Sequence, residues 1–199
     1  MKSDSIAFGI AGIAFGLIAG WIIGSQQAPS RQPPPQATTA QAPAQANTRA
    51  AVIDDAKVTA LKSVAEREPS NAKPRIDLGN LYFDAERYDD AITWYEAALK
   101  LTPRDVNLST DLGVCYYYTN QPDKALAQFD KSLAIDPKHA KTLLNLGIVR
   151  AFGKQDLAGA TKAWEQVMAI DPNSPEGQAA KRALDTLRSA HGGDTKPGA

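Results

Sequence analysis

The sequence holds very few of the residues that build metal and redox sites. It has one cysteine, Cys115, and two histidines, His139 and His191, in 199 residues. One cysteine excludes an intramolecular disulfide and a cysteine zinc cluster, and two isolated histidines are too few for a set of metal ligands. A single thiol fits a reducing compartment and, if it is buried, an oxidising one as well. We therefore predict no bound metal and no cofactor.

The sequence also lacks the short motifs of common catalytic sites. It contains no glycine-rich phosphate loop and no GxSxG, HExxH, CxxC or CxxCH motif. Adjacent carboxylates do occur, at Asp54-Asp55 and Asp89-Asp90. They fall at expected helix starts, where a negative charge offsets the helix dipole. We predict that the protein is not an enzyme.

Charge of one sign is also missing, because the formal net charge at neutral pH is zero. Residues 1–50 carry Lys2, Arg31 and Arg49 against Asp4, which leaves the rest of the chain at minus two. A protein that binds nucleic acid needs a basic patch or stripe, and this sequence has none. We expect no nucleic-acid partner.

Long uncharged apolar sequence occurs once, at the N-terminal end. Residues 6–23 read IAFGIAGIAFGLIAGWII, without a charge, and about 20 such residues cross a bilayer. We predict a transmembrane anchor over residues 1–25, with residues 6–25 in the membrane. The alternative is a cleaved signal peptide, which has a shorter apolar region and a small-x-small site where this chain has Gln26.

Glycines recur at every fourth position of the apolar segment. Gly12, Gly16, Gly20 and Gly24 form one helical stripe, where the backbone of a second helix can approach closely. The stripe indicates homo- or hetero-association, although small residues are common in membrane helices in any case. Lys2 precedes the segment, which favours a cytoplasmic N-terminus. We therefore expect a single-pass membrane protein. In a bacterium, the anchor would lie in the inner membrane and the remaining chain in the periplasm.

Residues 26–50 are rich in proline, glutamine and alanine and contain no leucine, isoleucine, valine or aromatic residue. Such a segment cannot bury enough apolar surface to order itself. We predict a disordered linker that acts as a tether. The alternative is a PxxP-type ligand for another protein.

The sequence after residue 50 repeats itself with a period of 34 residues. Each repeat contains a Leu-Gly pair, followed by an alanine with an aromatic residue four positions later, and prolines mark the repeat boundaries. The Leu-Gly pairs are Leu78-Gly79, Leu112-Gly113 and Leu146-Gly147; the alanine and aromatic pairs are Ala91 and Tyr95, Ala125 and Phe129, and Ala160 and Trp164; the prolines are Pro69, Pro103, Pro137 and Pro172. This pattern resembles the tetratricopeptide repeat (TPR) family.

The resemblance implies an all-α fold, an α-solenoid of three helix pairs with flanking helices. We place the repeats at about 70–103, 104–137 and 138–172, within a domain spanning residues 51–190. Each pair consists of helix A, which carries the glycine, and helix B, which carries the aromatic residue. The glycines are expected to let the two helix backbones approach, and the prolines to end helix B. Residues 52–68 are expected to form a leading helix.

The C-terminal end and the third repeat differ from the consensus of the earlier repeats. Residues 174–190 are predicted to form a capping helix with a polar outer face, and residues 191–199 a disordered tail. In the third repeat Arg150 replaces the tyrosine of the earlier repeats, and one extra residue lies between Gly153 and Ala160. We expect looser packing of helix A in this repeat.

A solenoid of this kind offers a concave groove lined by its A helices, where an extended peptide or a partner's helix can bind. The amides of Asn80 and Asn145 are placed to bracket a backbone amide. The clamp that some TPR proteins use for chaperone tails is not carried over, because Ile76 stands where it needs lysine. Each candidate is alternatively ordinary surface; the candidates are Lys73, Asp77, Asn80, Asp84, Asn107, Asp111, Tyr118, Lys141 and Asn145.

Three functions follow from these features. The first is a membrane-anchored scaffold or adaptor that binds a protein or peptide partner in its groove, in the assembly or maturation of an envelope complex. The second is a cytochrome c maturation subunit that holds apocytochrome, because the run A-x-x-x-W-E-x-V followed by D-P-N-S-P resembles anchored TPR subunits of that machinery. The third is a structural membrane protein that assembles with itself through the glycine stripe.

Overall fold

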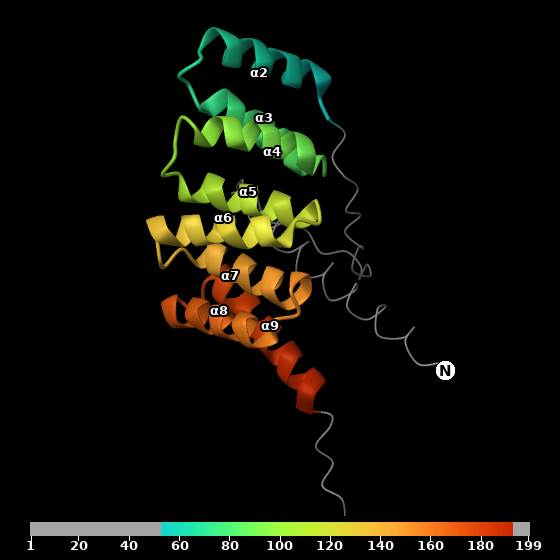
Figure 1. Ribbon diagram of the computed structural model, residues 1–199, viewed down its shortest axis with the longest axis vertical. Coiled ribbons are helices and arrows are strands. Elements are labelled where there is room, and N and C mark those ends of the chain that lie inside the picture. Colours follow the sequence, from blue (N-terminus) through green and yellow to red (C-terminus); the bar gives the residue numbers. More distant parts are fainter. Residues whose placement is uncertain (1–52, 193–199) are drawn as a thin grey trace, which may run out of the picture. The chain divides into compact units, whose positions relative to one another are not determined.

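The computed structural model describes residues 53–192, all within the compact unit Ala50–Ala199. This part of the chain is all-helical, with eight α-helices, one short π-helix and no strand (Figure 1). The predicted anchor, linker and C-terminal tail lie outside the described residues. The helices are α2 (Asp55–Arg67), α3 (Lys73–Asp84), α4 (Tyr88–Leu99), α5 (Val106–Tyr118), α6 (Pro122–Ile135), α7 (Ala140–Ile148), the π-helix η1 (Val149–Gly153), α8 (Leu157–Ile170) and α9 (Pro175–Gly192).

Three pairs of helices form the body of this unit, as the repeat predicts. The A helices are α3, α5 and α7, and they pack on the B helices α4, α6 and α8, respectively. Each B helix also packs on the following helix, so the elements stack in chain order from α2 to α8 (Figure 1). The leading helix α2 covers α3, and α9 packs against both α7 and α8. The sequence-based assignment of three pairs with two flanking helices is confirmed.

The glycine of each repeat accommodates a buried aromatic ring. A Cβ atom built on Gly79, Gly113 or Gly147 would overlap the ring of Tyr95, Phe129 or Trp164, respectively. All three rings are at most 1% exposed. The sequence predicts a close approach of two helix backbones at these glycines, whereas their nearest neighbour in the structure is the helix B side chain. The glycine and the aromatic residue therefore act as one unit of packing.

The turns between helix A and helix B share one backbone feature. Glu86, Asn120 and Gln155 adopt left-handed conformations with φ of 57°, 58° and 56°. They are spaced by 34 and 35 residues, so the turn recurs with the repeat. A left-handed conformation is unfavourable for a residue that carries a Cβ atom. The tight turn therefore costs a little stability in each repeat.

The third repeat departs from our expectation in two respects. The extra residue is absorbed at the end of helix A, where Val149–Gly153 forms a π-helix with a hydrogen bond from the Lys154 amide to the Val149 carbonyl. A π turn adds one residue without breaking the helix. All residues from Thr142 to Val149 are buried, because α9 adds a further packing surface. The prediction of looser packing is wrong.

The predicted membrane localisation needs correction. Among residues 53–192 no helix is both long enough and apolar enough to cross a bilayer. The predicted span, residues 6–25 with its glycine stripe, lies outside the described residues. The single-pass membrane assignment is therefore withdrawn.

Candidate peptide-binding surface

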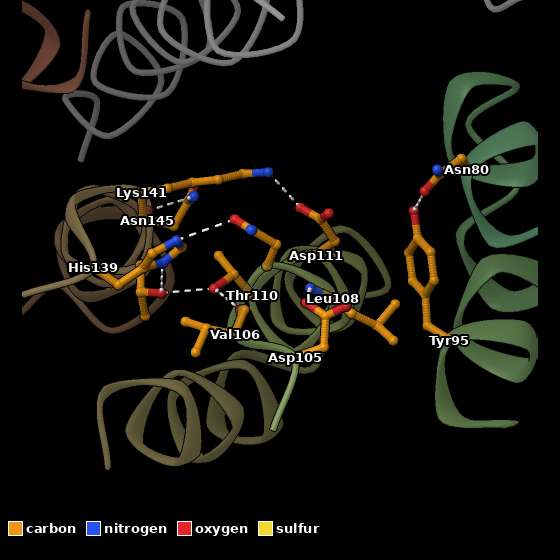
Figure 2. A network of polar contacts seen from close by, with 12 residues as sticks. Asn80, Tyr95, Asp105, Val106, Leu108, Thr110, Asp111, His139, Lys141 and Asn145 are labelled. Atoms are coloured by element: carbon orange, nitrogen blue, oxygen red, sulfur yellow. Dashed lines mark hydrogen bonds and ion pairs between the residues drawn. The ribbon is translucent and has the colours of Figure 1, made fainter. Parts of the chain in front are cut away.

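The candidate site lies on the side chains that the A helices α3, α5 and α7 direct to one side, here called the A-helix surface. Figure 2 shows Lys141 on α7 reaching Asp111 on α5, and Asn80 on α3 facing Tyr95 on α4. Equivalent positions of successive A helices fall on one surface because the repeat stacks them in the same orientation. We use this name for the nine predicted residues together with His139, whose ring contacts Asn107.

The α3 part of the A-helix surface carries two carboxylates and one amide. Asp77 forms an ion pair of 3.0 Å with Lys73, one helical turn away. The Asn80 Oδ1 atom accepts a hydrogen bond of 2.7 Å from the Tyr95 hydroxyl, which leaves its amide nitrogen toward solvent. Partial burial raises the pKa of Asp84, and the positive charge of Lys57 opposes this shift. Asn80 is thus held in place while one of its polar groups stays accessible.

An ion pair joins the second and third repeats. Lys141 Nζ on α7 donates a hydrogen bond of 2.7 Å to Asp111 Oδ1 on α5. The two side chains are only 18% and 26% exposed. Burial raises the pKa of Asp111, and the nearby Lys141 charge opposes the rise. The positive charge of Lys141 is therefore neutralised within the protein.

Two of the predicted residues are less accessible than the sequence indicates. Asn145 is 6% exposed and donates a 2.9 Å hydrogen bond to the carbonyl of Lys141 in its own helix. The Tyr118 ring stacks on Tyr88 at 4.5 Å between centroids and 11° between planes. Burial raises the pKa of Tyr118 to about 12. The structure does not bring Asn80 and Asn145 together as two exposed amides.

Sequence reasoning missed a chain of hydrogen bonds between α5 and α7. The Thr110 and Thr142 hydroxyls are 2.6 Å apart, and both residues are fully buried. His139 Nδ1 lies 2.7 Å from Thr142 Oγ1, and its Nε2 atom lies 3.1 Å from Asn107 Oδ1 (Figure 2). The repeat register holds a signal for this chain, because Ile76 and Leu108 occupy the equivalent positions one repeat earlier. Threonines in place of apolar residues indicate a polar junction.

No group of three or more potential metal ligands occurs within residues 53–192. Burial raises the pKa of the Cys115 thiol far above its usual value, so the thiol is protonated and unreactive. The chemistry of the A-helix surface is therefore hydrogen bonding, ion pairing and contact with tyrosine rings.

The fold and this surface define a class, the α-solenoid built from repeated helix pairs. Two family models described as tetratricopeptide repeat match residues 70–138 and residues 110–175. Residues 70–175 therefore consist of tetratricopeptide repeats, as the sequence pattern predicts. No curated protein matches the sequence. Proteins built from this repeat are generally interaction scaffolds without catalytic activity.

Solved structures with the same fold include complexes with peptides. A crystal structure of MamA protein aligns with a TM-score of 0.57 and 22% identity, over 69% of this chain and 78% of that one. The first TPR of Spaghetti (RPAP3), bound to the HSP90 peptide SRMEEVD, aligns at 0.52 and 25%, over 70% and 97%. The Yersinia enterocolitica type III secretion chaperone SycD, in complex with a peptide of the translocator YopD, aligns at 0.55 and 18%, over 62% and 94%.

These similarities support the predicted fold but not the more specific roles predicted from the sequence. The described part of the chain has the fold of peptide-binding TPR domains. The comparisons do not support the predicted membrane anchor or the similarity to cytochrome c maturation subunits.

Proposed function

We propose that the protein is a non-catalytic scaffold that holds an extended segment of a partner protein on the A-helix surface. The observation that carries this proposal is the row of polar side chains from successive A helices on one side of the solenoid. Asn80 and Asn107 are exposed amides on neighbouring A helices, and an amide can both donate to and accept from a peptide backbone. The TPR domains solved with bound peptides support the same function.

The charges on the A-helix surface favour a partner segment that is neutral or basic. Lys73 and Lys141 are its two lysines, and each already pairs with an aspartate of the chain. Asp84 is exposed and contributes a further negative charge. An acidic segment such as SRMEEVD therefore meets no unpaired lysine here. The proposed ligand is an extended segment with apolar residues and at least one lysine or arginine.

The accessibility of the side chains favours α3 and α5 as the centre of the proposed binding surface. Helix α7 is buried from Thr142 to Ile148, and its Asn145 side chain is 6% exposed. Asn80, Asp84 and Asn107 are exposed. No contact within residues 53–192 favours a role in an envelope complex, in apocytochrome binding or in self-assembly. The proposal therefore includes none of these three roles.

A peptide display library tests the proposal on the full chain. We expect selected peptides to be enriched in lysine or arginine next to apolar residues. Asp84→Lys places a like charge beside the ligand cation and should weaken binding about tenfold. Asp130→Lys is the matched control, since Asp130 is an exposed aspartate on the B helix α6. Selection of acidic peptides, or equal losses in both variants, contradicts the proposal.

A further inference from the structure

The hydrogen-bond chain between α5 and α7 has a fixed direction. A carbonyl oxygen only accepts, so the Thr110 hydroxyl donates its single proton to the Val106 carbonyl at 2.7 Å. The Thr110 oxygen must then accept from the Thr142 hydroxyl, which lies 2.6 Å away. The Thr142 hydroxyl has no second proton to donate. The contact between Thr142 and His139 at 2.7 Å therefore requires that His139 Nδ1 carries a hydrogen.

This direction determines what Nε2 of His139 can do. In the neutral imidazole the only hydrogen is on Nδ1, so Nε2 is an acceptor that needs a donor. In the imidazolium Nε2 also carries a hydrogen and needs an acceptor. The partner of Nε2 is the Asn107 side-chain amide, with Oδ1 at 3.1 Å. That arrangement satisfies the imidazolium, whereas the neutral ring requires the amide nitrogen in the same place.

An asparagine amide can exchange its oxygen and nitrogen by a half-turn about one bond, with no other movement of heavy atoms. Asn107 is an exposed residue on the A-helix surface. When the amide oxygen faces His139, the amide N–H groups face outward; when the nitrogen faces His139, the oxygen faces outward. The outward group is therefore coupled to the protonation of the ring.

We propose that protonation of His139 switches Asn107 from a hydrogen-bond acceptor to a hydrogen-bond donor on the A-helix surface. The neutral ring presents the Asn107 oxygen to a partner N–H group, and the imidazolium presents the Asn107 N–H groups to a partner carbonyl. The switch itself depends only on contacts within the chain. Its consequence for binding rests on the function proposed above.

The surroundings of His139 set the pH at which the switch operates below the range in which a histidine ordinarily titrates. Burial lowers the pKa of His139 and is the largest influence. The charges around it are Asp136 in the preceding turn, Lys141 on α7, Asp111 on α5 and Glu176 on α9; the three carboxylates raise the pKa and Lys141 lowers it. Because burial dominates, His139 is neutral at neutral pH, and acidification produces the donor state.

Nitrogen NMR of the uniformly labelled full chain tests the switch without a ligand. The chain has two histidines, so His191→Gln assigns both imidazoles and wild-type His191 is the internal reference. We expect neutral His139 to carry its hydrogen on Nδ1. We also expect the Asn107 side-chain amide signals to shift with the midpoint of His139. A hydrogen on Nε2 in the neutral ring, or Asn107 signals that do not follow His139, would overturn the proposal.

Two variants separate the switch from general structural effects. Asn107→Asp replaces the amide with a permanent acceptor, so the proton affinity of His139 should rise about tenfold while that of His191 stays constant. Thr142→Val removes the acceptor that holds the hydrogen on Nδ1, so the neutral ring should gain the Nε2 tautomer. An unchanged proton affinity in the first variant, or an unchanged tautomer in a folded second variant, contradicts the mechanism.

The binding consequence is measured separately with a peptide selected from the library. Its affinity for the wild type should change across the titration of His139, and its affinity for Asn107→Ala should not. An equal pH dependence in both proteins disproves the role of Asn107 in binding while the NMR result stands. Failure of any peptide to bind disproves the proposed function and leaves the switch intact.

Discussion

Replacing Gly113 with alanine tests how the aromatic residue of each repeat is held. The new Cβ atom would lie 2.7 Å from Cδ1 and 3.2 Å from Cζ of Phe129, and closer still to Cε1. The ring cannot move away, because Phe129 is fully buried between helices. Overpacking of this kind costs roughly 3 kcal/mol, and the higher helix propensity of alanine returns about 1 kcal/mol. We expect Gly113→Ala to lower the free energy of unfolding by about 2 kcal/mol.

Denaturant unfolding followed by circular dichroism measures this loss, and a double-mutant cycle identifies its cause. Phe129→Leu removes part of the ring that the new methyl group meets. The combined Gly113→Ala/Phe129→Leu variant should therefore lose about 1 kcal/mol less free energy of unfolding than the two single variants lose in sum. Additive losses, or an increase in stability in Gly113→Ala alone, would refute the packing argument.

Three further changes test other parts of the fold. Glu86→Gly relieves the left-handed conformation at φ 57° and should stabilise the protein by up to about 1 kcal/mol, seen as a higher melting temperature; an equal gain from Glu96→Gly within α4 would contradict this. Trp164→Phe removes the 3.1 Å hydrogen bond from Nε1 to the Leu144 carbonyl and should cost about 1–2 kcal/mol in denaturant unfolding; an unchanged midpoint would show that the bond contributes nothing. The lowered pKa of His139 means that the unfolded chain binds more protons between its folded and ordinary pKa, so the contribution of His139 to stability falls as the pH drops through that range; His139→Gln should lack this pH dependence, and an identical pH profile would disprove it.

The sequence pattern was sufficient to predict the helix pairs, because each repeat carries a packing unit at fixed spacing. Gly79 and Tyr95, for example, lie sixteen positions apart, and the second repeat keeps the same spacing between Gly113 and Phe129. The pattern could not locate the π-helix. An extra residue between Gly147 and Ala160 can enter the helix or the following turn, and only the packing of Val149 and Ala151 decides between them.

The candidate site was less predictable than the fold. The pair Lys73 and Asp77 follows from their spacing on one helix, but the pairing of Asp111 with Lys141 depends on how two A helices pack. The burial of Asn145 depends on how the other helices pack around α7, which helical periodicity does not encode. His139 lies just before α7 and is not among the helix A positions that the repeat pattern indicates as surface. Its contact with Asn107 could therefore not be predicted from the sequence.

The most direct test of the central claim is to map where a selected peptide touches the full chain. The backbone amide signals of the labelled protein are compared with and without the peptide. We predict that the largest shifts fall on exposed A-helix residues of α3 and α5, around Asn80, Asp84 and Asn107, with small shifts on α4 and α6. Shifts concentrated on the exposed faces of α4 and α6 would contradict a scaffold that holds its partner on the A-helix surface.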